Sequence, residues 1–144
     1  MKPTGGVFVI AFAMACLSGP VAAQLTPTDE VSAKNPVKLD RAALESLVPG
    51  TTSESVARNG NQRKWENMAG GRLRGSSRGP HSRIGGLVGE GKWRIQDDGK
   101  LCVEIGWTGP QHSSEEKWCA PVVKAGDDYY VMFQAGAMKM SFSK

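Results

Sequence analysis

The residues with the clearest capacity for chemistry form a run of arginines and glycines. Residues 58–94 hold nine Lys or Arg against two Glu, a local charge of +7, in a chain of 144 residues whose net charge is +4. Guanidinium groups can grip a phosphate or a carboxylate with two hydrogen bonds, so this run could meet an anionic surface. The alternative is a solvated loop whose arginines only keep it soluble. On the first interpretation, one side of a binding site comprises Arg72, Arg74, Arg78 and Arg83.

Other residues that could carry catalysis are sparse. His81 and His112 are the two histidines, and no Cys or His cluster supplies the further ligands that zinc requires. A Ser-His-acid site would need a nucleophile-elbow pattern, which the sequence lacks. The glycines of residues 85–91 lack the Lys-Ser/Thr of a phosphate loop, and we expect a strand after them, not a helix. We therefore expect no metal and no cofactor.

The elements that position these residues are best defined around Gly99. Apolar residues alternate with polar ones on both sides of an Asp-Asp-Gly step, which predicts a β-hairpin. A three-residue loop with Gly99 in the left-handed conformation places Trp93 opposite Val103 and Ile95 opposite Leu101. A two-residue turn would divide the apolar residues between two faces, which a sheet with one buried face disfavours. The three-residue loop is therefore predicted.

The same register extends to the next strand and pairs two cysteines. With Cys102 opposite Cys119, Glu104 faces Lys117 and apolar residues face apolar ones. The third cysteine, Cys16, lies in a segment that we expect to be removed or lipidated, which leaves an even number. An even number of cysteines suits an oxidising compartment. We predict a disulfide between Cys102 and Cys119, with two unpaired thiols as the alternative.

The first 23 residues have the pattern of a secretory signal peptide. Lys2 precedes an apolar run over residues 7–17, and a small-residue cleavage site ends before Gln24. The apolar run is too short to span a bilayer, so we expect no transmembrane segment in the mature chain. We expect a periplasmic or secreted location, which disfavours nucleic acid as a partner. The alternative is a lipoprotein signal, with the chain anchored through Cys16.

The rest of the chain has the length of one domain. Residues 24–37 are polar with scattered prolines and predict a disordered arm, followed by a single β-rich domain over residues 38–144. Asp40 is expected to cap a short N-terminal helix over residues 41–48. Short strands with glycine turns predict a mainly β fold, which could be a small antiparallel meander, half-barrel or barrel. The other strands are expected at residues 52–56, 62–68, 72–76 and 129–133, and the 134–144 tail could add an edge strand.

Several motifs resemble those of a known family. The run G-x-W-x-x-x-x-D-G-K-L-C from Gly91 is followed by W-C at Trp118 and by G-D-D-Y-Y at Gly126. Together they resemble an uncharacterised proteobacterial family of exported proteins, the domain of unknown function 995. A Pro-Gly-Thr-Thr step after the helix and the W-E-N-M-A-G-G stretch at Trp65 are also similar, so the likeness covers about residues 39–133. The Gly/Arg run before Gly91 departs from the family pattern, and the resemblance supplies no catalytic residues.

Aromatic side chains offer a second kind of binding surface. Tryptophans at alternating strand positions are expected in the core, whereas Trp65 or Trp107, near strand ends, are the candidates for exposure. Taken together, these patterns predict a non-enzymatic exported β-domain that binds an anionic envelope component, such as lipopolysaccharide phosphates, or an acidic protein. One alternative is an envelope-acting hydrolase that uses His81 or His112. Another is a lipid-anchored structural protein of the outer membrane.

Overall fold

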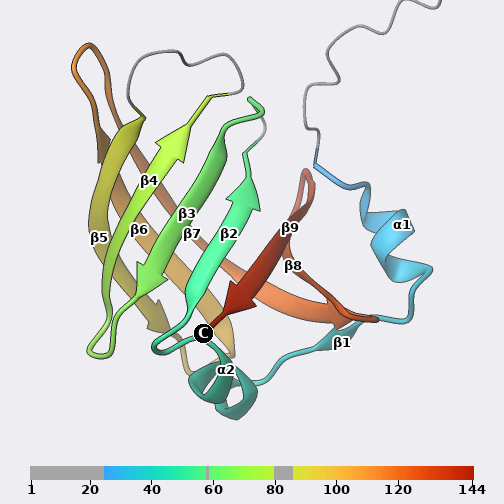
Figure 1. The fold of residues 1–144 in the computed structure, drawn as a ribbon. Coiled ribbons are helices and arrows are strands. Elements are labelled where there is room, and N and C mark those ends of the chain that lie inside the picture. Colours follow the sequence, from blue (N-terminus) through green and yellow to red (C-terminus); the bar gives the residue numbers. More distant parts are fainter. Residues whose placement is uncertain (1–24, 58, 80–85) are drawn as a thin grey trace, which may run out of the picture.

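The computed structural model describes residues 25–57, 59–79 and 86–144, and these form an eight-stranded antiparallel barrel (Figure 1). Strands β2 to β9 each pair with the next strand in the sequence, and β9 returns to pair with β2. A short strand, β1, adds to β7. The predicted mainly β fold is confirmed. The elements are α1 Thr28–Ser32, β1 Val37–Lys38, α2 Arg41–Leu47, β2 Thr52–Val56, β3 Gln62–Asn67, β4 Arg72–Arg78, β5 Leu87–Ile95, β6 Lys100–Thr108, β7 Ser113–Ala125, β8 Asp128–Phe133 and β9 Gly136–Ser143.

The last strand, β9, closes the barrel. It pairs with β8 through Val131 and Met138, and with β2 through Ser53 and Phe142. The sequence leaves this tail open and allows an edge strand, whereas in the structure β9 is hydrogen-bonded on both sides. Alternation of apolar residues identifies a strand but not its partners. Closure leaves the barrel without the unpaired edges of an open sheet.

The central hairpin has the register that the sequence predicts. Trp93 lies opposite Val103 across β5 and β6, and Gly99 adopts a φ of 76°, as a three-residue loop requires. Cys102 lies opposite Cys119 across β6 and β7, and the two form a disulfide with their Cα atoms 4.0 Å apart. The predicted loop and the predicted disulfide are both confirmed.

Alternate residues of each strand point into the barrel and fill it. Trp65 and Trp107 are only 2% and 1% exposed, so the expectation that one of them is exposed is wrong. In a closed barrel an inward position near a strand end still faces the opposite wall, so it stays buried. The same interior cluster includes Leu73, Leu101, Val103, Ile105, Ala120, Val122, Val131, Met138 and Met140.

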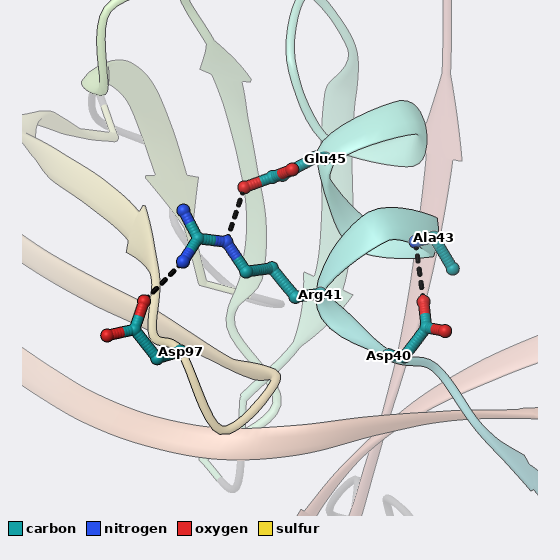
Figure 2. Close-up of polar contacts among 5 residues, drawn as sticks. All are labelled: Asp40, Arg41, Ala43, Glu45 and Asp97. Atoms are coloured by element: carbon teal, nitrogen blue, oxygen red, sulfur yellow. Dashed lines mark hydrogen bonds and ion pairs between the residues drawn. The ribbon is translucent and has the colours of Figure 1, made fainter.

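Helix α2 covers one end of the barrel, which we call the closed end (Figure 1). The Asp40 side chain caps it by accepting a hydrogen bond from the Ala43 N–H at 2.8 Å (Figure 2). Leu44 and Val48 are fully buried in the interior cluster. The predicted helix and its cap are confirmed. Seven residues cannot hold a helix alone in water, so this packing is what stabilises α2.

Arg41 links α2 to the turn between β5 and β6. Its Nε donates to Glu45 at 2.6 Å, and its Nη1 donates to Asp97 in that turn (Figure 2). The hydrogen bond to Glu45, with the charges of Glu45 and Asp97, raises the pKa of Arg41 above its ordinary value. All three side chains are at least half exposed, so these ion pairs contribute little to stability. They orient the helix on the barrel.

Residues 25–37 differ from the predicted disordered arm. Thr26 forms a bridge with Ala137, and α1 buries Val31 completely against the outer face of the barrel, beside Tyr130 (Figure 1). A five-residue helix with one buried residue leaves no periodic signal in the sequence, so only packing reveals it. Residues 1–24, with the predicted signal peptide and Cys16, lie outside the described residues. Within the described chain, no helix has both the length and the apolar character needed to cross a membrane.

Candidate functional site

A cavity of about 730 Å³ lies at the end of the barrel opposite α2, which we call the open end. It forms where β2 and β4 end and where β3, β5 and β9 begin. Inward side chains such as Ser55 and Leu87 line it, and outward side chains line its rim. Its charged lining residues are four cations and one carboxylate, namely Arg63, Lys64, Arg78, Lys139 and Glu54.

An ion pair lies just inside the open end. Arg63 on β3 binds Glu116 on β7 through its Nη1, and the two side chains are only 19% and 17% exposed. Glu116 also accepts hydrogen bonds from Trp107 Nε1 at 3.2 Å and from Trp118 Nε1 at 3.1 Å. The Arg63 guanidinium carbon lies 5.7 Å from the centre of the Trp107 ring. Because a buried ion pair is seldom a net source of stability, its position at a cavity marks a candidate site.

Two serines flank Arg63 on the neighbouring strands. Ser55 on β2 and Ser77 on β4 lie directly opposite Arg63, and both are buried. The Ser55 Oγ and the Arg63 Nε have no hydrogen-bond partner. A buried polar atom without a partner costs about 1–3 kcal/mol, so natural barrels rarely keep one without a reason. The inner wall of the open end therefore presents unused hydrogen-bonding capacity.

Three of the four arginines singled out in the sequence lie on β4. Arg72, Arg74 and Arg78 are exposed at alternate positions on the outer face of β4, which runs two residues beyond its predicted end. Arg74 lies opposite Glu66 on β3 and opposite Glu90 on β5, so two carboxylates flank it. Arg83 lies outside the described residues.

These arginines do not converge on one point. Arg72 lies opposite Lys92 near the closed end, whereas Arg78 lines the cavity at the open end. Six residues of extended strand separate them, a span of about 20 Å. Of the three arginines on β4, only Arg78 reaches the cavity.

Sequence reasoning missed Arg63, Glu116 and Ser55 as site residues. The Asn-Gly step between β2 and β3 signals a hairpin, but a two-residue Asn59-Gly60 turn would put Ser55 opposite Lys64, whereas the observed register puts it opposite Arg63. The contact between Arg63 and Glu116 has no comparable signal, since it crosses the inside of the barrel. Only closure of the barrel brings these two residues together.

Of the two candidate catalytic histidines, the structure describes His112. His112 is exposed in the turn between β6 and β7, where its carbonyl accepts a hydrogen bond from the Gly109 N–H at 2.8 Å. His81 lies outside the described residues. Across residues 25–57, 59–79 and 86–144, no group of three or more His, Cys, Asp or Glu side chains could hold a metal ion.

Comparison with known proteins identifies the family. A family model described as "Protein of unknown function (DUF995)" matches residues 17–139, so the chain belongs to this family. The resemblance found in the motifs is thereby confirmed. No curated protein and no solved structure matches the chain.

Proposed function

We propose that this member of the DUF995 family is an exported, non-enzymatic binding protein that holds an anionic envelope component at the open end of its barrel. The excess of cations around the cavity, four against one carboxylate, is the observation that carries this proposal. A concave site lined by one sign of charge, with low-dielectric walls, concentrates ligands of the opposite sign. Export rests on the pattern of residues 1–23 and on the disulfide, which suits an oxidising compartment.

Arg78 is the principal contact in this proposal. Lys64 pairs with Glu54 at 2.7 Å, and Lys139 pairs with Asp128 at 2.8 Å, so both rim lysines already have a carboxylate partner. Among the described residues, Arg78 makes no ion pair, and it is exposed at the rim. Its planar guanidinium can grip a phosphate or carboxylate oxygen pair.

The other three arginines contribute less to ligand binding in this proposal. Two carboxylates on neighbouring strands offset the charge of Arg74. Arg72 adds its charge to that of Lys92, but at the far end of the strand. Arg83 follows Arg78 by five residues in the sequence, and we keep it as a candidate contact on charge alone.

The test is binding of the purified protein to vesicles with and without anionic lipid, and to lipopolysaccharide, at low and high salt. We expect binding that needs the anionic component and weakens as salt rises, because salt screens exposed charges. Arg78→Ser should weaken binding several-fold. Arg72→Ser is the matched control, since it removes the same charge from the same face of β4 at the other end.

Equal binding by both variants and the wild-type protein would refute the role of the open end. The absence of binding at low salt would refute the envelope ligand altogether. If the protein captures an acidic protein but binds neither anionic vesicles nor lipopolysaccharide, the ligand is a protein partner and not an envelope component.

A further inference from the structure

We infer that the inner wall of the open end is a head-group site for a small amphiphile, a carboxylate or phosphate monoester joined to a short apolar group. Arg63 and Ser55 are the contacts for the charged head. This inference rests on the proposed function and deepens it, because it names the class of ligand and the residues that hold it.

The geometry of Arg63 leaves one edge of its guanidinium for a ligand. Its Nη1 binds Glu116, and its Nε has no partner. A planar guanidinium has a second edge, formed by Nε–H and Nη2–H, that matches the two oxygens of a carboxylate or phosphate. Glu116 is itself held by two indole N–H groups, so it fixes Arg63 without using that edge.

Ser55 supplies a third donor beside this edge. It lies directly opposite Arg63 across β2 and β3, is 7% exposed, lines the cavity, and its Oγ has no partner. Within the described residues, Ser55 Oγ and Arg63 Nε are the two buried side-chain nitrogen or oxygen atoms that lack a partner. They belong to adjacent residues of the same wall. An oxyanion would provide the acceptor that both atoms lack.

The rest of the barrel limits the size of the ligand. Trp65 lies two residues nearer the closed end than Arg63 on β3, and it packs with the rest of the buried interior cluster, so an apolar chain cannot extend down the barrel axis. Both unpartnered atoms are covered, so Arg63 must turn slightly about its side-chain bonds to receive the head. The apolar part of the ligand must then remain in the mouth of the cavity.

The mouth of the cavity offers apolar surface for that part. Three large apolar side chains are exposed in the described chain, and two of them, Val56 and Val88, line the cavity. Leu87 and Met138 line it from inside the barrel. Val56 and Val88 are separated by β3 and β4, so they border the mouth on two sides. Apolar side chains around a few polar groups are the usual composition of a small-molecule site. The charged head therefore points inward, and the apolar group stays against the apolar side chains of the mouth.

The experiment uses octanoate and octyl phosphate as probes, with octylammonium and octanol as controls. Tryptophan fluorescence of the purified protein reports binding, because Trp107 and Trp118 share Glu116 with Arg63. We expect saturable binding of one or both anionic probes. Octylammonium and octanol should bind at least tenfold more weakly. The two anionic probes distinguish a carboxylate head from a phosphate head.

Two variants test the named contacts. Ser55→Ala should weaken binding of the anionic probe by about threefold to tenfold, the effect of one lost hydrogen bond, without destabilising the fold. Arg63→Lys keeps a positive charge for Glu116 but removes the planar guanidinium and its free edge. Binding of the anionic probe should therefore weaken more than in Ser55→Ala. Ser53→Ala is the matched control, because Ser53 points inward from the same strand two residues closer to the closed end.

Equal binding of octylammonium and octanoate, or unchanged affinity in both Ser55→Ala and Arg63→Lys, would overturn the inference. The absence of saturable binding by either anionic probe would overturn it too. If anionic vesicles still bind in that case, the proposed function survives without the head-group site. If octanoate binds and Ser55→Ala weakens that binding while the protein does not bind anionic vesicles or lipopolysaccharide, the head-group site is supported. The proposal that the protein binds an anionic envelope component is then refuted.

Discussion

Inward-pointing serines at the two ends of the barrel differ in their hydrogen bonding. At the closed end, Ser53 is 1% exposed and its Oγ accepts a hydrogen bond from Asn67 Nδ2 at 2.7 Å. Two residues further along the same strand, Ser55 also points inward, yet its Oγ has no partner. Ser53 at the closed end therefore has a partner, whereas Ser55 Oγ and Arg63 Nε at the open end lack one.

The surroundings of the two serines follow the same division. Asn67 bonds to Trp65 Nε1 at 3.1 Å and to the Thr51 carbonyl at 3.2 Å, and α2 covers this end with Leu44. The open end has a cavity, an ion pair and rim cations. The closed end therefore stabilises the fold, and under the proposed function the open end would give up some stability for binding.

The largest expected effect is at the helix that covers the closed end. Leu44→Ala should lower the free energy of unfolding by about 2–5 kcal/mol, since it removes a fully buried side chain and leaves a cavity. Leu87→Ala at the open end, where the side chain is only partly buried, should cost less than half as much. Urea denaturation of both variants measures the difference. Equal losses would show that the two ends are equally packed.

The next effect concerns the polar network of the closed end. Asn67→Leu should cost about 1–3 kcal/mol, because Trp65 Nε1 loses its acceptor inside the core. Ser55→Ala makes the comparison at the open end, where the removed hydroxyl has no partner to leave unsatisfied. Its stability should equal or slightly exceed that of the wild-type protein. Chemical denaturation of the pair checks this, and a costly Ser55→Ala would mean that the hydroxyl has a structural role.

A smaller effect is expected at the turn that meets α2. Gly99→Val should cost about 1 kcal/mol, because Gly99 has a φ of 76°, which a residue with a Cβ resists. An added Cβ would lie 3.4 Å from the Arg41 nitrogen, an ordinary contact distance, so the cost comes from the backbone conformation. Gly106→Ala is the control, since its Cβ would meet nothing closer than 3.9 Å and its φ is not positive. Thermal unfolding at one scan rate compares them, and identical midpoints would contradict the strain argument.

The smallest effect is expected from acid at the turn between β7 and β8. The hydrogen bond from Lys139 holds the pKa of Asp128 below its usual 3.8, so this group favours the folded state above that pH. That contribution is lost as the pH falls through the lowered pKa. Asp128→Asn should therefore reduce the drop in stability between neutral and acidic pH. A pH series of urea midpoints for both proteins tests the sign.

Local pairings were predictable because they depend on residues close together in the chain. The register of Trp93 and Val103 follows from a three-residue loop and one apolar face, and the disulfide follows from extending that register. The cap of Asp40 on α2 is likewise a local pattern. In each case a few side chains and a short loop leave one consistent arrangement.

The candidate site was not predictable from residues close together in the chain. The arginines of β4 attracted attention by their charge, but strand geometry spreads them over about 20 Å of the outer face. Arg63 carries the same charge on the neighbouring strand, and alternation alone turns it inward. A charge count cannot separate these two cases, because it ignores the direction of each side chain.

The β class, the hairpin register, the disulfide and the capped helix follow from the amino-acid sequence, since each depends on neighbours along the chain or on alternation on one face. Three features appear only in the folded chain: β9 closes on β2, α2 covers one end, and Arg63 meets Glu116 across the interior. Those contacts join distant segments, and the loss of chain entropy in bringing them together is offset only by the packing of the whole barrel.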